Sequence, residues 1–314
     1  MSATIQILRA SDCSFDELAT AFNRGFEGYA IPPAMTGQAM EERVSEQDIL
    51  LDSSLVLSGE DGPAGIGLMG VRGARAWCGE LAIAPAYRGG GWGRLLIERL
   101  IQVARARSLK EMWLEVLTEN TPAFQLYQSL GFRIERELTT YSGPLGHQIA
   151  RRAFTGPLML QGLDDAGEEG EESLPERAPV AIEAHVALAD YEALQLVRPS
   201  WEYERVVLDR LAAAGRLRAL AISGEEEGSG PDAYLLAEAR ENGAVRLMGF
   251  GARPGADAAG GLELATTLVS ALTQQYAGAT FSAAEVPPGD PRGPVLESAG
   301  CPVVYRYFEM ALAL

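Results

Sequence analysis

Glycine and arginine gather between a predicted strand and a predicted helix, in the stretch IAPAYRGGGWGR at residues 83–94. Glycine loses more conformational freedom on folding than other residues, so this density indicates that bare backbone is required there. The first backbone N–H groups of a helix lack intrahelical partners and carry partial positive charge, which lets them bind an anion. A phosphate can approach these groups only where no Cβ stands in its way. With Arg88 and Arg94 on either side, the stretch predicts a phosphate-binding loop.

Two common phosphate-binding motifs do not fit this spacing. A P-loop needs a lysine directly after its last glycine, and no lysine follows here. A dinucleotide-binding fingerprint needs G-x-G-x-x-G, but its third glycine would fall on Arg94 or Leu96, depending on where the motif begins. The sequence therefore predicts neither a P-loop nor a dinucleotide-binding fold.

A second set of chemically active side chains lies downstream, in LEVLTENTPAFQLYQSLGF at residues 114–132. Glu115 lies in the predicted strand EMWLEVL, and Tyr127 lies on a predicted helix that begins at Asn120. A phenol can donate a proton and a carboxylate can accept one, as general acid–base chemistry requires. Glu80, just before the apolar stretch LAIA, is a second candidate base. The structural alternatives are a core aromatic for Tyr127, a helix N-cap for Asn120 and a solvated strand position for Glu115.

Together the two stretches resemble the GNAT acetyltransferase superfamily. LAIAPAYRGGGWGRLL resembles its motif A, [QR]-x-x-G-x-[GA] after a strand, with Arg88, Gly91 and Gly93 at the fixed positions. The stretch at residues 114–132 resembles motif B, and the two motifs follow one another in the family's order. The resemblance implies an N-acetyltransferase that uses an acyl-coenzyme A, usually acetyl-CoA, and transfers the acetyl group directly to a primary amine.

The resemblance also implies which residues contact the acyl-CoA. Its pyrophosphate would bind the loop amides, and its pantetheine arm would add alongside the preceding strand like an extra β-strand. The residues implied are Leu81, Ala82, Ile83, Arg88, Gly89, Gly90, Gly91, Trp92, Gly93, Arg94, Asn120 and Ala123. We expect no metal, because three widely spaced cysteines and two histidines form no ligand pattern.

The family's chemistry assigns roles to three side chains. The resemblance implies that Tyr127 is the general acid that protonates the coenzyme's sulfur. Glu115 matches the base of the ribosomal-protein alanine acetyltransferase subfamily, whereas Glu80 matches the base of other branches, and both assignments stay open. Cys78 is a poor candidate nucleophile because no histidine partner is evident.

The amine acceptor would border the segment FNRGFEGYAIPPAMT at residues 22–36. Phe22, Phe26 and Tyr29 share one helical face there, so core packing is an alternative to a substrate wall. The acceptor is a small molecule or a peptide. Two other functions remain open: an acyltransferase that uses a longer acyl-CoA, and an acyl-CoA-binding sensor without turnover.

Composition narrows the class of protein. The 314 residues carry a net charge of −17, which argues against partners such as nucleic acid or an anionic membrane. No apolar run approaches the roughly 18–20 residues of a membrane span. The first residues show no secretory pattern, and the cysteines suggest no disulfides, so we expect a cytoplasmic protein.

The predicted elements occur twice in the same order. The acidic stretch 161–179 is the expected linker between an active domain at 1–160 and a second domain at 180–314. We predict an α/β fold in which each domain has a central mixed β-sheet flanked by helices, with VAIEAHV as the second domain's first strand.

The second copy lacks the residues expected to do chemistry. NTPAFQLYQSLGF aligns without gaps on GDPRGPVLESAGC, which sets Tyr127 opposite Leu296 and Asn120 opposite Gly289. A leucine cannot deliver a proton, so we expect a degenerate, inert GNAT-like domain. It would pack against the first as an intramolecular pseudo-dimer, an arrangement compatible with a monomeric chain.

Overall fold

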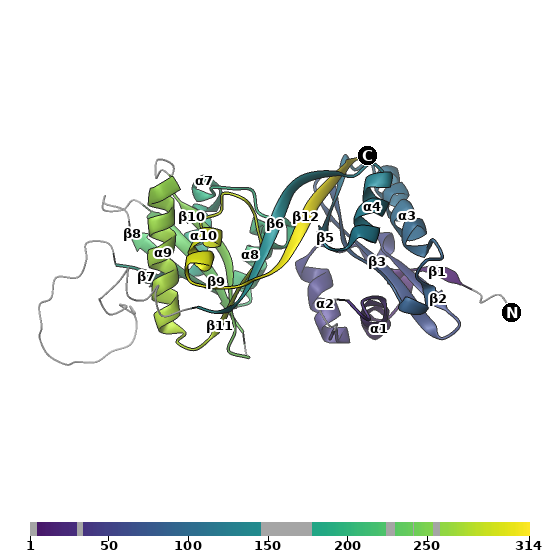
Figure 1. Cartoon of the computed structure of the whole chain (residues 1–314), viewed down its shortest axis with the longest axis horizontal. Helices are drawn as coiled ribbons and strands as arrows, with labels where there is room; N and C mark the ends of the chain where they lie inside the picture. Colours follow the sequence, from purple (N-terminus) through teal and green to yellow (C-terminus); the bar gives the residue numbers. More distant parts are fainter. Residues whose placement is uncertain (1–4, 30–33, 146–177, 224–229, 241, 254–257) are drawn as a thin grey trace, which may run out of the picture. The chain divides into compact units, whose positions relative to one another are not determined.

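The computed structural model describes residues 5–29, 34–145, 178–223, 230–240, 242–253 and 258–314 (Figure 1). The chain divides into two compact units. Unit 1 comprises Met1–Arg136 and Tyr307–Leu314, and unit 2 comprises Glu137–Arg306. The predicted linker at 161–179 lies outside the described residues except at its last two positions, and the predicted domain boundaries remain a prediction.

Unit 1 is a mixed sheet with helices on both faces, as the α/β prediction requires. Its sheet order is β1-β2-β3-β4-β5-β12, antiparallel except for β4 and β5. The strands are β1 Gln6–Arg9, β2 Leu55–Gly59, β3 Gly62–Arg72, β4 Arg75–Ile83, β5 Glu111–Leu117 and parts of β6 Arg133–Pro144 and β12 Val303–Ala313. The helices are α1 Phe15–Gly25, α2 Gly37–Glu46, α3 Trp92–Ala106 and α4 Thr121–Ser129, with short 3-10 turns η1 Ala10–Asp12, η2 Leu51–Ser53 and η3 Pro85–Tyr87.

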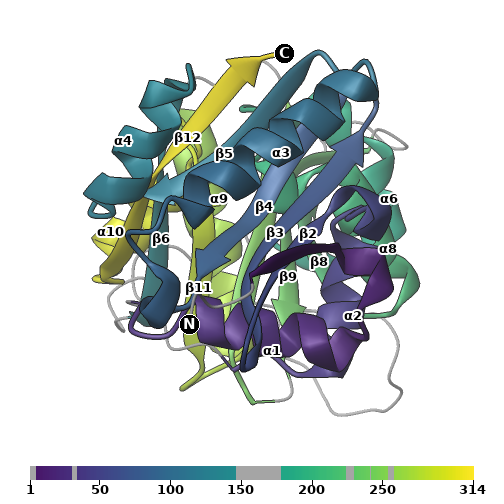
Figure 2. The same ribbon diagram turned by 90° about the vertical axis from the view of Figure 1, so that its right-hand side faces the viewer.

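Two apolar clusters fix the helices of unit 1 on opposite faces of its sheet (Figures 1 and 2). One cluster joins α3 and α4 to β5 through residues such as Leu100, Leu114 and Tyr127. The other joins α1 and α2 to β3 through residues such as Leu18 and Ile66. A capping box forms at the start of α1, because the Ser14 and Glu17 side chains each accept from the other's backbone N–H.

The strands β4 and β5 pair only at their beginnings. Their parallel register runs from Arg75↔Glu111 to Trp77↔Trp113, and no later β4–β5 pair occurs in the described part of the chain. The two strands therefore diverge, and the last residues of β4 are not paired with β5. The divergence exposes the edge of β4 along which the GNAT resemblance implies that the pantetheine arm binds.

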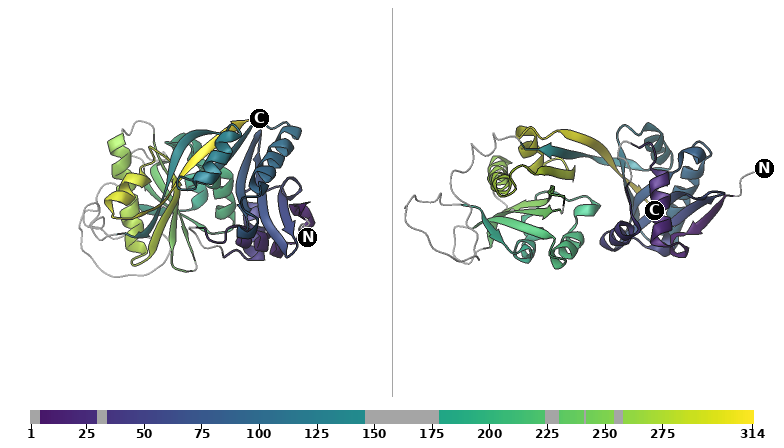
Figure 3. Two further views of the ribbon diagram at one scale, coloured as in Figure 1. Left: turned by 45° about the vertical axis from the view of Figure 1, so that its right-hand side comes forward. Right: turned by 90° about the horizontal axis from the view of Figure 1, so that it is seen from below.

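The last strand of the chain completes the sheet of unit 1. β12 pairs antiparallel with β5 over seven positions, from Tyr307↔Leu117 to Ala313↔Glu111. The C-terminal end of the yellow strand in Figure 3 accordingly lies among the purple and blue elements of unit 1. In exchange, the later part of β6 pairs with β11 in unit 2, from Thr139↔Val286 to Pro144↔Thr280.

Unit 2 repeats the architecture of unit 1. Its sheet joins β7-β8-β9-β10-β11-β6, with β10 and β11 parallel and diverging after two pairs. Its strands are β7 Val180–Ile182, β8 Leu217–Ser223, β9 Pro231–Ala239, β10 Val245–Ala252, β11 Thr280–Val286 and parts of β6 and β12. Its helices are α6 Ala184–Ala189, α7 Tyr191–Leu194, α8 Arg205–Ala213, α9 Ala258–Gln275 and α10 Arg292–Ser298, with the 3-10 turn η4 Trp201–Tyr203. The predicted strand VAIEAHV is wrong in its second part, because His185 lies in α6.

Candidate active site

The glycine loop has the backbone conformation that its composition predicts. Gly89 and Gly91 have φ angles of 78° and 80°, in the left-handed region that favours glycine. Gly91 is the N-cap of α3, and no side chain caps the first turn of this helix. A Cβ at Gly93 would come no closer than 3.8 Å to its neighbours, Ile83 and Leu126. The first amides of α3 therefore remain available to an anion.

A cavity of about 560 Å³ opens beside this helix start. Strand β4 supplies one wall, and the N-terminal turn of α4 supplies another. Of the residues predicted to bind acyl-CoA, all but Gly90 line it: Leu81, Ala82, Ile83, Arg88, Gly89, Gly91, Trp92, Gly93, Arg94, Asn120 and Ala123. The volume lies within the range of small-molecule sites, roughly 300–1,000 Å³.

The two arginines of the loop are engaged with the protein itself. Arg88 donates to the backbone carbonyls of Ile83, Gly25 and Glu27, at 2.8, 3.0 and 2.7 Å. It thereby joins the end of β4 to the end of α1. Arg94 is ion-paired with Glu98 at 3.1 Å and donates to the Ser129 hydroxyl at 2.6 Å. Arg94 is half exposed at the cavity, so its charge remains close to any anion bound there.

Tyr127 lies on α4 with its side chain between the cavity and the core. It is only 6% exposed and packs against Phe132, with ring centroids 5.8 Å apart. Burial raises the pKa of Tyr127 well above its ordinary value of 10, and the neighbouring Cys78 and Tyr29 raise this pKa further. The phenol therefore stays protonated at neutral pH and can act as a proton donor.

Asn120 connects the cavity to a tyrosine that sequence reasoning did not single out for this role. Its Oδ1 accepts from the Ala123 N–H at 3.3 Å, as an N-cap should, and its Nδ2 donates to the Tyr29 hydroxyl at 2.9 Å. Tyr29 lines the cavity and also packs edge-on against Phe26, with centroids 5.2 Å apart. Its only signal in the sequence is its place at the end of the first helix, where core packing is an equally good explanation.

The two candidate bases lie outside the residues that line this cavity. Glu80 is 8% exposed and forms an ion pair with Arg43 of α2 at 2.7 Å. Glu115 accepts a hydrogen bond from the Trp77 indole at 2.7 Å. Because alternate β5 residues such as Leu114 pack beneath α3 and α4, the Glu115 side chain faces the side of the sheet that α1 and α2 cover.

Cys78 has no nucleophilic character in this setting. Burial raises the pKa of its thiol far above the ordinary value, and the charges of Glu80 and Glu115 raise this pKa further. No group of three or more His, Cys, Asp or Glu side chains among the described residues could hold a metal ion. Nor does the described part of the chain contain a helix long and apolar enough to cross a membrane.

Unit 2 has different side chains at the corresponding positions. Trp77 and Trp113 form a parallel pair in unit 1, and Arg246 and Ser282 form one in unit 2. The residues of the first pair precede those of the second by the same number of positions that separates Tyr127 from Leu296 in the gapless match. Extending this offset puts Gly249 at the place of Glu80, Ala284 at that of Glu115, Gly289 at that of Asn120, Arg292 at that of Ala123 and Leu296 at that of Tyr127.

The arginine at Ala123's place fills the corresponding space. Arg292 and Asp290 are both buried, and they are joined by hydrogen bonds of 2.7–3.1 Å. Arg292 also donates to the carbonyl of Leu247 on β10, at 3.0 Å. The cavity that remains there measures only about 20 Å³.

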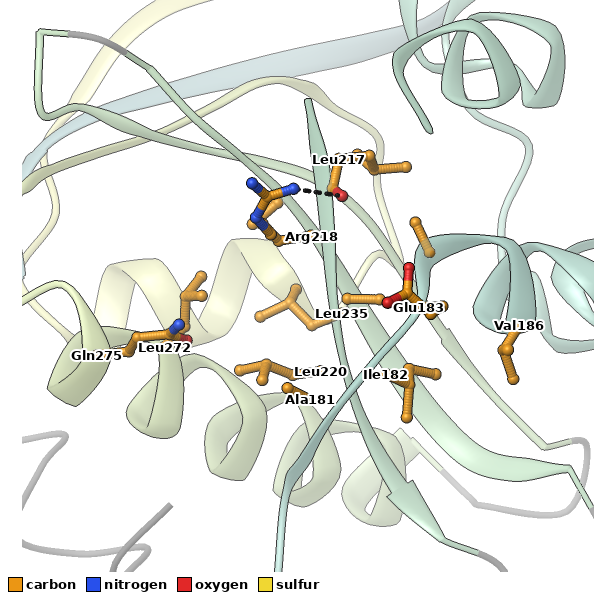
Figure 4. Close-up of a pocket in the computed structure, with 13 residues that line it drawn as sticks. Ala181, Ile182, Glu183, Val186, Leu217, Arg218, Leu220, Leu235, Leu272 and Gln275 are labelled. Carbon is orange, nitrogen blue, oxygen red and sulfur yellow. Dashed lines mark hydrogen bonds between the residues drawn. The ribbon is translucent and has the colours of Figure 1, made fainter. Parts of the chain in front are cut away.

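A larger cavity of unit 2 lies elsewhere, between β7–β9 and α9 (Figure 4). It measures about 520 Å³, and its lining is mostly aliphatic, with Glu183, Arg218 and Gln275 as its polar side chains. Arg218 donates to backbone carbonyls, including that of Gly215 at 2.8 Å. None of the positions that correspond to the candidate catalytic residues of unit 1 lines this cavity.

Comparisons with known proteins agree with the geometry of unit 1. Residues 22–132 match the family model described as Acetyltransferase (GNAT) family. The chain is 44% identical over 53 residues to the [ribosomal protein bS18]-alanine N-acetyltransferase of Escherichia coli, a match that covers 17% of this chain and 36% of that protein. It is 40% identical over 53 residues to the streptothricin acetyltransferase of Streptomyces lavendulae, covering 17% and 28%. The chain thus spans about a third of the length of these curated relatives.

Two solved structures are similar over nearly the whole chain. A GCN5-related N-acetyltransferase from Sphaerobacter thermophilus has a TM-score of 0.65 at 14% identity, covering 99% of this chain and 95% of that one. A tandem GNAT protein from the clavulanic acid biosynthesis pathway has a TM-score of 0.64 at 13% identity, covering 99% and 98%. At these identities the likeness shows the fold alone.

Proposed function

Since this chain carries a GNAT acetyltransferase domain within a tandem GNAT fold, we propose that it transfers an acetyl group from acetyl-CoA to a primary amine. The active site lies in unit 1. The observation that carries the proposal is the cavity bounded by the uncapped start of α3, the diverging end of β4 and Tyr127.

The residues of this cavity fit an acyl-CoA. The first amides of α3 and the guanidinium of Arg94 would hold its diphosphate, because both offer positive charge at one end of the cavity. The edge of β4 that diverges from β5 at Leu81–Ile83 would hold its amide-bearing arm by strand addition, with the Ile83 carbonyl already occupied by Arg88. When bound, the acyl-CoA supplies a thioester as the acyl donor.

Tyr127 is the proposed general acid. Its raised pKa keeps the phenol protonated, and its place on the cavity lets it donate to the departing sulfur. Removing only the hydroxyl should therefore slow turnover and leave acyl-CoA binding largely intact.

Glu115 is the proposed base, in preference to Glu80. The ion pair with Arg43 stabilises the ionised form of Glu80 and occupies one of its oxygens, which weakens it as a proton acceptor. Glu115 accepts a hydrogen bond from the Trp77 indole at 2.7 Å, which fixes the orientation of its carboxylate. It also matches the base that the resemblance to the ribosomal-protein alanine acetyltransferases implies.

Unit 2 is proposed to be inert. It has Leu296 and Gly249 where unit 1 has Tyr127 and Glu80, and Arg292 fills the space that Ala123 leaves open. One chain should therefore bind one acyl-CoA. The two copies would form an intramolecular pseudo-dimer in a cytoplasmic protein.

The acceptor is proposed to be the amine of a small molecule or a peptide. The relatives named above are acetyltransferases for an alanine of a ribosomal protein and for streptothricin. An α-amine with a pKa near 8 is neutral about a tenth of the time at pH 7, whereas a lysine amine is neutral less than about a thousandth of the time. A single water-relayed carboxylate therefore suits an acceptor with a low pKa.

A screen of amine acceptors that monitors release of free thiol from acetyl-CoA tests this function. We expect thiol release with at least one amine, one acyl-CoA bound per chain by calorimetry, and loss of release in Tyr127→Phe. Binding without release across small amines, peptide N-termini and aminoglycoside-like antibiotics would instead support a sensor. Faster thiol release from a longer acyl-CoA would mean that the donor is not acetyl-CoA, but it would leave the proposed site unchanged.

A further inference from the structure

The C-terminal strand brings a carboxylate next to the proposed base. In the β5–β12 ladder, Glu309 is directly opposite Glu115. Directly opposed residues of antiparallel strands project from the same face, with their Cβ atoms about 4.5–5.5 Å apart. Glu309 therefore lies beside Glu115, although it comes from the far end of the sequence.

Glu309 is held by a buried ion pair. It is 1% exposed, and both of its oxygens accept from Arg136 of β6, at 2.7 Å from Nε and 3.0 Å from Nη2. A bidentate guanidinium both neutralises a carboxylate and fixes its plane. Two like charges side by side on paired strands would otherwise destabilise the sheet, so Arg136 makes the neighbouring glutamates compatible.

Other charged and titratable groups also act on Glu115 within unit 1. The Trp77 indole donates to it from β4, and the Glu80–Arg43 ion pair joins β4 to α2. Cys78 lies on the opposite face of β4, and the charge of Glu115 contributes to raising the pKa of its thiol. The groups near Glu115 in unit 1 thus include Trp77, Cys78, Glu80, Arg43, Glu309 and Arg136, together with Tyr307, which stands diagonally opposite Glu115 on β12.

We propose that the Arg136–Glu309 pair is a positioning device that sets the proton affinity of Glu115, and that the C-terminal strand is thereby part of the active site. The proposal rests on the function proposed above for Glu115. With the pair intact, Glu115 has a neutral ion pair as its neighbour. Loss of Arg136 leaves the negative charge of Glu309 unbalanced beside Glu115. Loss of the Glu309 charge instead leaves the positive charge of Arg136 unbalanced near Glu115.

These two losses must move the titration of Glu115 in opposite directions. In Arg136→Met, the added negative charge favours the protonated form, so the midpoint should rise by about one pH unit. In Glu309→Gln, the positive charge of Arg136 is no longer balanced by the negative charge of Glu309 and favours the ionised form of Glu115, so the midpoint should fall by a similar amount. The double variant Arg136→Met/Glu309→Gln removes both charges and should return close to the wild-type midpoint.

The test is a carboxyl ¹³C NMR titration of the full chain labelled selectively at glutamate, with the Glu115 resonance identified by its loss in Glu115→Gln. Arg306→Gln is the matched control, because Arg306 and Glu137 form an exposed ion pair at 2.9 Å between the same two strands. The control should leave the midpoint unchanged. If Arg136→Met fails to fold, Glu309→Gln still tests the downward shift, since glutamine keeps the shape of the side chain.

Shifts of opposite sign support the proposal, because damage to packing would not invert between the two variants. Shifts of the same sign, or no shift in either variant, overturn it. The measurement does not depend on turnover. Failure of the proposed function would appear separately, as a wild-type protein that shows these shifts yet releases no thiol with any amine. In an active protein, Glu309→Gln should also lower kcat about tenfold and leave KM for acyl-CoA unchanged. The unbalanced positive charge of Arg136 stabilises ionised Glu115 and so makes it a weaker proton acceptor.

Discussion

Truncation of Arg292 to alanine tests how much the buried Asp290–Arg292 ion pair contributes to the stability of unit 2. The guanidinium makes three contacts of 2.7–3.1 Å with Asp290 and one of 3.0 Å with the Leu247 carbonyl. Its removal leaves a buried carboxylate without its cation, which costs about 3–5 kcal/mol. The orphaned carbonyl adds about 1–3 kcal/mol. We therefore expect unit 2 to lose about 4–8 kcal/mol, with the lower value favoured because the truncation makes room for water.

Calorimetric melting measures this loss. For a unit of about this size, each kcal/mol moves Tm by roughly 2–4 °C, so the unit 2 transition should fall by about 8–30 °C. Arg253→Ala is the matched control, because its ion pair with Asp232 at 2.8 Å is 45% exposed on the arginine side and should cost at most about 1 kcal/mol. Acyl-CoA should still bind with a stoichiometry of one.

Two results would refute this reasoning. A Tm for Arg292→Ala within about 2 °C of the wild type would mean that the pair does not stabilise unit 2. A stoichiometry of two acyl-CoA molecules per chain would mean that Arg292 alone keeps unit 2 from binding, and that the loss of the other site residues matters little.

The remaining predictions concern unit 1. Tyr127→Phe should lower kcat by roughly 10²–10⁴-fold with acyl-CoA affinity kept, because only the proton donor is removed; an unchanged kcat in the thiol-release assay would contradict this. Because burial raises the pKa of Tyr127 well above 10, loss of this proton should not reduce wild-type turnover below about pH 10, whereas an alkaline limb near pH 8 that disappears in Tyr127→Phe would speak against it. Tyr29→Phe removes the 2.9 Å hydrogen bond to Asn120 and should weaken acyl-CoA binding about two- to tenfold, measured by calorimetry with Phe26→Leu as a packing control. Gly91→Ala places a Cβ where φ is 80° and should cost about 1 kcal/mol in stability together with a measurable loss of acyl-CoA affinity, so unchanged affinity would count against the loop as the anion site.

Local patterns in the sequence predict most of the elements. The helix after the glycine loop and the strand EMWLEVL both occur as predicted, and the S-x-x-E pattern at Ser14 and Glu17 is a local signal of the capping box that begins α1. Gly89 and Gly91 can be interpreted from the sequence because few residues other than glycine adopt the left-handed backbone conformation that both have. Each of these features is decided by residues close together in the chain, which is where propensity and periodicity carry information.

Other features depend on distant partners. Arg88 could be placed at the loop, but its bonds to the carbonyls of Gly25 and Glu27 depend on where α1 ends in space. Tyr29 could be placed on an aromatic face, but its bond to Asn120 joins residues 91 positions apart. The run VAIEAHV predicts a single strand, but a short apolar run fits a strand or a helix equally well, and the structure ends β7 at Ile182 and puts His185 in α6.

The exchange of strand ends gives a physical reason why an inert second half would be retained. Without β12, β5 would become a sheet edge with a row of unpaired backbone groups, and Glu115 would lose the neighbour that Arg136 neutralises. The entropic cost of bringing the chain end back to β5 grows only slowly with the length between them, so a large intervening unit is tolerated. Non-local pairing does slow folding, and β12 is the last strand of the chain, so the sheet of unit 1 is completed only when β12 is available. The proposed function therefore requires no ligand site in unit 2, but it does require the strand that leads out of unit 2 into the sheet of unit 1.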